Sequence, residues 1–186
     1  MSHPSIVLVG MMGAGKSTVG KALAKHLSWE FVDTDHLIEQ QTGVSIPTIF
    51  EIEGEAGFRR RESQVLTSLT GRQGLVVATG GGIVLAQANR VHLKEVGPVV
   101  YLSASAAELY QRTRMDKNRP LLQSPNPRKT IEDLLTLRHP LYTEVSDLTI
   151  ETGRQPVSHL VQRICDALGL VASVVAPQTR GAEDNE

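Results

Sequence analysis

Short runs of β-branched and other apolar residues recur along the chain, with helical patterns between them. The apolar runs lie at residues 5–9, 30–32, 75–78, 99–102 and 148–150. Several contain no charged position, as expected for parallel strands that are covered on both faces. Helical spacing of apolar residues occurs near residues 16–27, 59–70, 105–114, 130–138 and 157–168. This alternation predicts a three-layer α/β domain with right-handed crossovers.

Two stretches interrupt the alternation. Residues 34–58 insert further helical structure between the second strand and the next long helix. Residues 114–129 combine five basic side chains with three prolines, which predicts a mobile lid, although a solvated surface loop would have a similar composition. Residues 171–186 turn to small, apolar and acidic residues, and we expect a disordered tail there. The sequence therefore predicts a single domain over residues 1–170.

Composition narrows the class of protein. The chain has 186 residues, of which 40% are hydrophobic, enough for one globular core. Its formal net charge of -1 gives no overall attraction to nucleic acid or to an acidic membrane, and no apolar run is long enough to span a bilayer. Because the first strand begins so near residue 1, we expect no cleaved signal peptide.

The cysteine content indicates the cellular compartment that we expect for the protein. Cys165 is the one cysteine, which excludes an intramolecular disulfide and leads us to expect a reducing cytoplasm. Its position in an apolar stripe of helical spacing favours packing in the core over a role as a reactive thiol.

The segment Gly10–Ser17 is a complete phosphate-binding loop, G-x-x-x-x-G-K-[ST]. It follows a predicted strand and precedes a predicted helix, as this motif requires, and the helix N-terminus adds its dipole to the anion site. Lys16 can reach the outer phosphates of a nucleotide, and the Ser17 hydroxyl is a suitable Mg²⁺ ligand. The residues that we expect to bind ATP here are Gly13, Ala14, Gly15, Lys16, Ser17 and Thr18.

Two further segments follow strands and so belong at the same edge of the sheet. Asp33 and Asp35 follow the second strand; one carboxylate could hold the hydration shell of Mg²⁺ and the other could orient or deprotonate a substrate hydroxyl. Asp35 could instead be the N-cap of a helix that begins at His36. Gly80, Gly81 and Gly82 follow the third strand, and three glycines favour a backbone that a ligand approaches closely.

A cluster of arginines opens the long helix. Arg59, Arg60 and Arg61 are consecutive, and a guanidinium that faces the crevice would suit a carboxylate ligand. The residues alone do not say which of the three faces the crevice, and an ordinary charged helix surface is the alternative. Glu62 lies three positions after Arg59, so it could brace that arginine on one helix face.

Taken together, these motifs resemble the shikimate kinase family over roughly residues 5 to 165. Besides the segments above, the resemblance rests on Ile49-Phe50, Gly54-Glu55, Phe58-Arg59-Arg60-Arg61-Glu62, Arg119-Pro120-Leu121-Leu122 and Arg138-His139-Pro140-Leu141-Tyr142. It implies a P-loop kinase fold with a five-stranded parallel sheet in the order 2-3-1-4-5. It also implies transfer of the ATP γ-phosphoryl group to the 3-hydroxyl of shikimate, on the route to chorismate and the aromatic amino acids.

The resemblance assigns roles in acceptor binding. It selects Arg59 rather than its two neighbours as a partner of the shikimate carboxylate, with Arg138 as the second partner. Asp35 would bind the shikimate hydroxyls and could serve as the base. The backbone of Gly80–Gly82 would line the same pocket, within a substrate-binding insert over about residues 34–62.

On the nucleotide side, the resemblance makes Arg119 the lid arginine that closes over the phosphates, so that Lys16, Asp35 and Arg119 are the predicted catalytic residues. Arg112 would flank the adenine, and the loop that contains Arg154 and Gln155 would lie on the adenine side. One Mg²⁺ would accompany ATP, bound by Ser17 and, through water, by Asp33. We expect a cytoplasmic monomer whose partners are ATP and shikimate, with no nucleic acid and no membrane.

Other functions stay open on the residues alone. A kinase for another small anionic acceptor, such as gluconate or a nucleoside monophosphate, would also use paired arginines. A P-loop switch ATPase would transfer phosphate only to water, and a binding module would have lost catalysis altogether. Pro47 departs slightly from the family pattern, and we expect it in the first turn of a helix, where no hydrogen bond is lost.

Overall fold

The computed structural model describes residues 5–116 and 123–170. Its centre is a parallel sheet of five strands in the order β2-β3-β1-β4-β5, which confirms the predicted topology. The strands are β1 Ile6–Val9, β2 Glu30–Asp33, β3 Leu75–Ala78, β4 Val99–Ser103 and β5 Leu148–Glu151. All residues of β1 and β3 are buried, which agrees with their unbroken apolar sequence.

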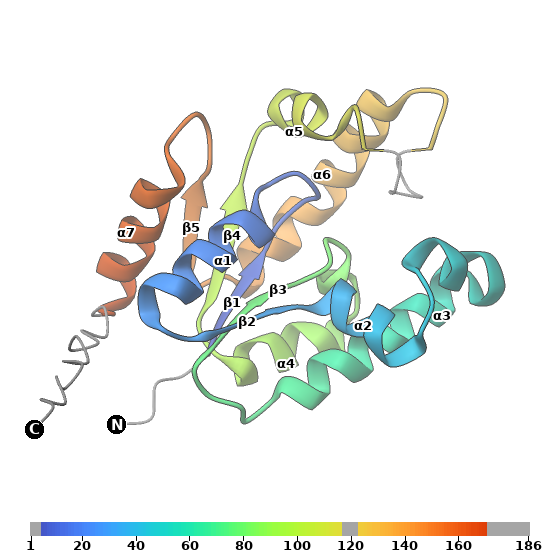
Figure 1. The fold of residues 1–186 in the computed structure, drawn as a ribbon. Coiled ribbons are helices and arrows are strands. Elements are labelled where there is room, and N and C mark those ends of the chain that lie inside the picture. Colours follow the sequence, from blue (N-terminus) through green and yellow to red (C-terminus); the bar gives the residue numbers. More distant parts are fainter. Residues whose placement is uncertain (1–4, 117–122, 171–186) are drawn as a thin grey trace, which may run out of the picture.

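Helices cover both faces of the sheet, as Figure 1 shows. On one face α1 (Lys16–Leu27) packs against α7 (Val157–Leu168). On the other face α4 (Gln87–Val96) packs between α3 (Ile46–Leu69) and α6 (Pro127–Val145), beside the short 3₁₀ helix η1 (Ile83–Leu85). The helix α5 (Ala106–Thr113) packs on α6. The result is the predicted three-layer arrangement.

Two helices differ from the prediction. The pattern gives no helix between β3 and β4, yet α4 lies there; its core-facing positions are Asn89, Leu93 and Val96, too few apolar residues for a clear stripe. Helix α6 runs past the predicted end at residue 138 and includes Pro140. Proline costs this helix one backbone donor, but the flanking turns pack into the core through Arg138 and Tyr142 and sustain it.

The insert after β2 is helical, as expected. It comprises α2 (Thr34–Thr42) and the first part of α3, which begins after the N-cap Ser45 with Pro47 in its first turn. Gly54 breaks α3 with a left-handed φ of 69°, a conformation that glycine adopts without strain. Four buried residues form a small core of the insert, separate from the main one: Ile38, Ile49, Phe58 and Val65.

Cys165 lies buried on α7 within the main core, and burial raises the pKa of its thiol. This agrees with packing rather than reactivity. In the described part of the chain, no helix combines the length and apolar character that a membrane span needs. The predicted tail, at residues 171–186, and the central part of the predicted lid, at residues 117–122, lie outside the described residues.

Candidate active site

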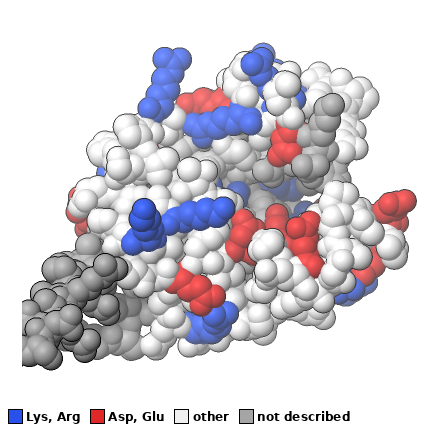
Figure 2. Space-filling model, in the orientation of Figure 1, with Lys and Arg blue, Asp and Glu red and all other residues white. Residues whose placement is uncertain are grey.

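The strand order brings three loops together. Because β1 lies beside β3, and β3 beside β2, the segments that follow these strands meet at one edge of the sheet. Two cavities open there, of about 660 and 580 Å³. Figure 2 shows this face hollowed, with acidic and basic side chains meeting around the recess. The cavities share five lining residues, so they form two halves of one site: Met12, Asp35, Glu39, Gly80 and Gly81.

The phosphate-binding loop lines the first cavity. The Nζ of Lys16 donates hydrogen bonds to the carbonyl oxygens of Gly10 (2.7 Å) and Met11 (2.9 Å), so the ammonium group is held across the loop. Gly15 is the N-cap of α1 and offers no side chain to its first-turn N–H groups. An anion can therefore take the place of the capping side chain, at the positive end of the helix dipole.

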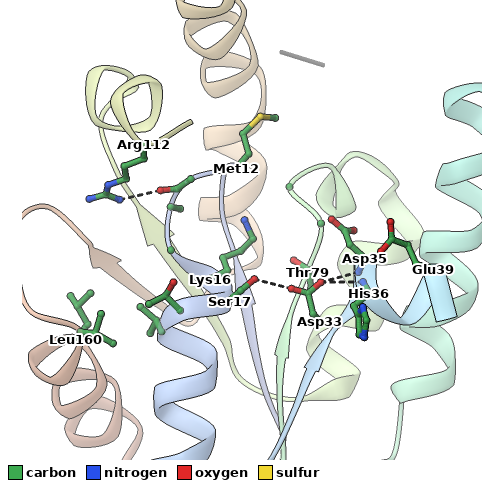
Figure 3. A pocket seen from close by; sticks show the side chains of 18 residues that line it. Met12, Lys16, Ser17, Asp33, Asp35, His36, Glu39, Thr79, Arg112 and Leu160 are labelled. Carbon is green, nitrogen blue, oxygen red and sulfur yellow. Dashed lines mark hydrogen bonds between the residues drawn. The ribbon is translucent and has the colours of Figure 1, made fainter. Parts of the chain in front are cut away.

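Ser17 and Asp33 meet at the floor of this cavity (Figure 3). The Ser17 hydroxyl donates to Asp33 Oδ2 at 2.8 Å, and Asp33 Oδ1 accepts from the backbone N–H groups of Asp35 and His36. Asp33 is thus the N-cap of α2, which begins at Thr34. The alternative that Asp35 caps a helix beginning at His36 is wrong, because α2 already begins at Thr34 and Asp35 lies inside its first turn.

The residues present fit a magnesium ion carried with a nucleotide. Within residues 5–116 and 123–170 no group of three or more His, Cys, Asp or Glu side chains is placed to hold a metal by itself. Mg²⁺ usually takes one or two protein oxygens and completes its shell with phosphate oxygens and water. The paired Ser17 hydroxyl and Asp33 carboxylate are oxygen donors of that kind.

Arg112 closes the far end of the nucleotide half. Its guanidinium donates to the carbonyls of Gly13 (3.2 Å) and Gly153 (2.7 Å), so it ties the phosphate-binding loop to the loop after β5. On that side the cavity is lined by Val157 and Leu160 of α7. Gln155 accepts a hydrogen bond from Arg163 outside this lining, and the predicted nucleotide contacts of Arg154 and Gln155 stay predictions.

Of the three consecutive arginines, Arg59 lines the second cavity. It donates to Glu62 at 2.9 Å, which confirms the pairing expected from the spacing, and also to Glu55 at 3.0 Å. Arg60 is exposed. Arg61 donates hydrogen bonds to both carboxylate oxygens of Glu53, which lies just before the Gly54 break in α3.

The Arg59–Glu62 pair is unusual in its burial. The Glu62 side chain is 0% exposed, and burial raises the pKa of this carboxyl although Arg59 counteracts the rise. Burial alone would lower the pKa of Arg59, but the two carboxylates outweigh it and raise that pKa. Glu62 Oε1 and Arg59 Nε are buried without a hydrogen-bond partner in the described structure. A polar ligand in this cavity would relieve that cost.

Arg138 projects from α6 into the same cavity. The residue is 2% exposed, and its Nε has no hydrogen-bond partner among the described residues. The buried guanidinium of Arg138 and the half-buried one of Arg59 line one small cavity and favour an anionic occupant, because each can hold a carboxylate or phosphate through two parallel hydrogen bonds.

The three glycines leave room for these charged side chains. A Cβ on Gly80 would lie 2.5 Å from Glu62 Oε1 and 2.9 Å from Asp35 Oδ1. On Gly81 it would lie 3.3 Å from an Arg138 nitrogen, and on Gly82 it would overlap the Arg59 guanidinium. Any side chain in this loop would displace a charged group of the site. Their contact with a ligand stays a prediction.

Some lining residues were not foreseen. Met12 and Glu39 line both halves of the site. The Glu39 carboxylate also accepts a hydrogen bond from the backbone N–H of Ile46 at 2.9 Å. Ile46 and Phe50 form the apolar wall of the second cavity. Their i, i+4 spacing in the insert was the available signal, whereas nothing local in the sequence sets Glu39 apart from a surface residue.

The fold and this divided site define a P-loop kinase that acts on a small molecule. The family model described as shikimate kinase matches residues 12–169. The chain belongs to the shikimate kinase family.

Individual relatives agree with this assignment. The shikimate kinase of Bordetella avium is 56% identical over 88% of this chain and 78% of that protein, and the one of Ralstonia nicotianae is 52% identical over 95% and 93%. A solved structure of shikimate kinase from Acinetobacter baumannii in complex with shikimate is 53% identical, covers 89% of this chain and 93% of the other, and has a TM-score of 0.87.

A gluconokinase structure from Sinorhizobium meliloti is also similar, with 18% identity, a TM-score of 0.56, and coverage of 89% of this chain and 91% of the other. At that identity the likeness shows a shared fold alone. It gives no support to gluconate as the acceptor.

Proposed function

We propose that this chain transfers the γ-phosphoryl group of ATP to the 3-hydroxyl of shikimate, giving shikimate 3-phosphate and ADP. The single observation that carries this proposal is the second cavity, in which Arg59 and Arg138 converge beside the nucleotide half of the site. A small alcohol that bears a carboxylate, such as shikimate, can pair its carboxylate with both guanidinium groups. Its hydroxyl then points toward the phosphate-binding loop. The membership of the shikimate kinase family supports the choice of acceptor.

On the nucleotide side, the loop from Gly13 to Thr18 holds the phosphates through its backbone N–H groups. Lys16 moves from its loop carbonyls to the outer phosphate oxygens, where its charge is needed as the phosphoryl group transfers. Ser17 would hold Mg²⁺ directly and Asp33 would hold it through water. When bound, the metal would neutralise negative charge on the nucleotide phosphates. Arg112 packs beside the base.

On the acceptor side, Arg59 and Arg138 hold the carboxylate, and this fixes the orientation of the ring. Asp35 lies between the two halves and orients the hydroxyl that is to be phosphorylated. A carboxylate there can also accept the proton that leaves this hydroxyl. The peptides of Gly80–Gly82 line the wall behind the ring.

Further roles rest on the family resemblance. Arg119, the proposed lid arginine that contacts the phosphates, lies outside the described residues, and so does the proposed tail. We also propose one domain over residues 1–170, a monomeric state and a cytoplasmic location. Arg154 and Gln155 are proposed to lie near the adenine.

A coupled assay of ADP release tests the proposal. Shikimate should stimulate ADP release at least a hundredfold, whereas gluconate and AMP should not. Arg59→Ala should raise the shikimate KM by about tenfold or more, because loss of a charged hydrogen-bond partner costs roughly 1.5–3 kcal/mol. Arg60→Ala is the matched control and should leave the KM within twofold. Strong ADP release without any acceptor would instead favour the switch ATPase.

A further inference from the structure

A buried tyrosine supports the glycine loop from behind. Tyr142 lies on α6 and is buried, and its hydroxyl donates a hydrogen bond to the carbonyl oxygen of Gly81. The bond joins residues 61 positions apart in the sequence. Tyr142 is not among the residues that line the two cavities, and nothing in the proposed transfer reaction uses it.

The Gly81 peptide lies where the two halves of the site meet. A Cβ built on Gly81 would lie 3.3 Å from an Arg138 nitrogen. The same Cβ would lie 3.4 Å from the Gly10 carbonyl oxygen and 3.5 Å from the Met12 backbone nitrogen, both in the phosphate-binding loop. The position of this peptide therefore sets the spacing between the acceptor arginine and the nucleotide loop.

Tyr142 is well suited to hold that peptide still. It lies four residues after Arg138, so both side chains leave the same face of α6. Its ring stacks on Tyr101 of β4, with 4.9 Å between ring centroids. Burial raises the pKa of its hydroxyl, although the charge of the Arg138 guanidinium and a hydrogen bond with it partly offset the rise, so the hydroxyl keeps its proton and can donate at neutral pH.

We propose that Tyr142 is a positioning residue for the acceptor: by fixing the Gly81 peptide, it holds Arg138 and the glycine loop at the spacing that shikimate requires from the phosphate-binding loop. This inference rests on the proposed function. It predicts an effect on the acceptor half of the site that is larger than any effect on the nucleotide half, because the phosphate-binding loop has its own bonds from Lys16 and Arg112.

The neighbouring Tyr101 offers a matched control. It is buried in the same aromatic stack, but its hydroxyl contacts His139 Nδ1 at 3.0 Å and does not reach the glycine loop. Tyr101→Phe and Tyr142→Phe each remove one buried hydroxyl and keep the ring. A general loss of stability would appear in both variants, whereas a loss of positioning would appear in Tyr142→Phe alone.

The test is steady-state kinetics with both substrates, together with thermal unfolding of each variant. Tyr142→Phe should raise the shikimate KM about fivefold to tenfold, the effect expected for one lost hydrogen bond, with the ATP KM within twofold of wild type. Tyr101→Phe should leave both KM values within twofold. An unchanged shikimate KM in Tyr142→Phe, or equal changes in the two variants, would overturn the proposal.

A second variant covers the case in which Tyr142→Phe is too unstable to assay. Gly81→Ala crowds the same peptide against Arg138 and the phosphate-binding loop and leaves Tyr142 intact, and it should raise the shikimate KM at least as much. An unchanged KM in this variant would also overturn the inference. Wild-type protein without shikimate-dependent ADP release would reject the proposed function instead, so the two failures are distinguishable.

Discussion

The buried carboxylate of Glu62 allows a sharp test of how the acceptor half is held. Arg59 contacts two carboxylates at nearly equal distances, Glu62 at 2.9 Å and Glu55 at 3.0 Å. The two differ in burial, because the Glu62 side chain is 0% exposed and the Glu55 side chain is 53% exposed. Replacing each carboxylate by the amide of the same shape changes the charge and leaves the packing in place.

Two opposing effects decide the stability of Glu62→Gln. Removing one partner of a buried ion pair costs roughly 3–5 kcal/mol, but Arg59 keeps Glu55 and is itself 20% exposed, which reduces the loss. Burial raises the pKa of Glu62, so the ionised carboxylate destabilises the fold above that pKa, and glutamine removes this cost. We expect a net loss of about 1–2 kcal/mol in the free energy of unfolding.

The effect on acceptor binding should be clearer. Without the Glu62 carboxylate, the Arg59 guanidinium loses its buried brace and samples other orientations. A loss of about 1.4 kcal/mol in binding corresponds to a tenfold rise in the shikimate KM. Glu55→Gln should change the free energy of unfolding by less than about 1 kcal/mol and the KM by less than twofold, as expected for an exposed pair.

Urea unfolding and the coupled ADP-release assay measure both quantities. Acidification adds an independent check: because the pKa of Glu62 is raised, its protonation begins above the pH at which an ordinary glutamate titrates. The wild-type shikimate KM should therefore rise in mildly acidic buffer, whereas that of Glu62→Gln should not follow. Equal effects of the two amide variants, or a wild-type KM in Glu62→Gln, would refute the argument that burial makes this pair important.

Three further variants probe the nucleotide half and the fold. Lys16→Met should lower kcat by about a hundredfold or more, the scale of one lost transition-state contact, and near-normal turnover would remove Lys16 from the mechanism. Gly13→Ala should raise the ATP KM at least about tenfold, because φ is +79° and the new Cβ would lie 2.6 Å from Thr113 Cγ2; ATP titration measures it. Hydrogen bonds from Ser105 lower the pKa of Glu108, so the ionised Glu108 carboxylate stabilises the folded protein. This stabilisation is complete above the ordinary glutamate pKa of 4.5, and it is lost as the pH falls below 4.5 toward the lowered pKa. Unfolding midpoints of Glu108→Gln should accordingly depend less on pH in this acidic range than those of wild type.

The elements that could be predicted are those with a strong local pattern. The strands are unbroken apolar runs, and α1 and α7 match the predicted bounds because each presents a regular apolar stripe to the core. Helix α4 was missed because it buries a polar residue, Asn89, whose amide donates to the carbonyl of Ile83. The predicted end of α6 was too early because packing of Arg138 and Tyr142 outweighs the helix-breaking tendency of Pro140.

In the site too, some features follow from the local sequence, whereas others follow only from the folded structure. That both aspartates line the cavity of the phosphate-binding loop follows from their place after a strand, but their separate roles do not follow from spacing. Only the folded chain shows that Asp33 bonds Ser17 and caps α2, while Asp35 faces the glycine loop. The choice among the three arginines likewise depended on family resemblance, since the Gly54 break that returns Arg61 to Glu53 leaves no periodic signal.

The two arginines of the acceptor cavity belong to different parts of the molecule, and this has a consequence for binding. Arg59 lies on α3 of the insert, whose small core of Ile38, Ile49, Phe58 and Val65 is separate from the main core. Arg138 lies on α6, whose neighbours Tyr142 and Val145 belong to the main core. A carboxylate held by both guanidinium groups therefore adds a contact across the cavity between the two cores, which α3 also connects through Leu66 and Leu69. The free energy of that contact stabilises one relative placement of the insert, so acceptor binding and the order of the insert are thermodynamically linked.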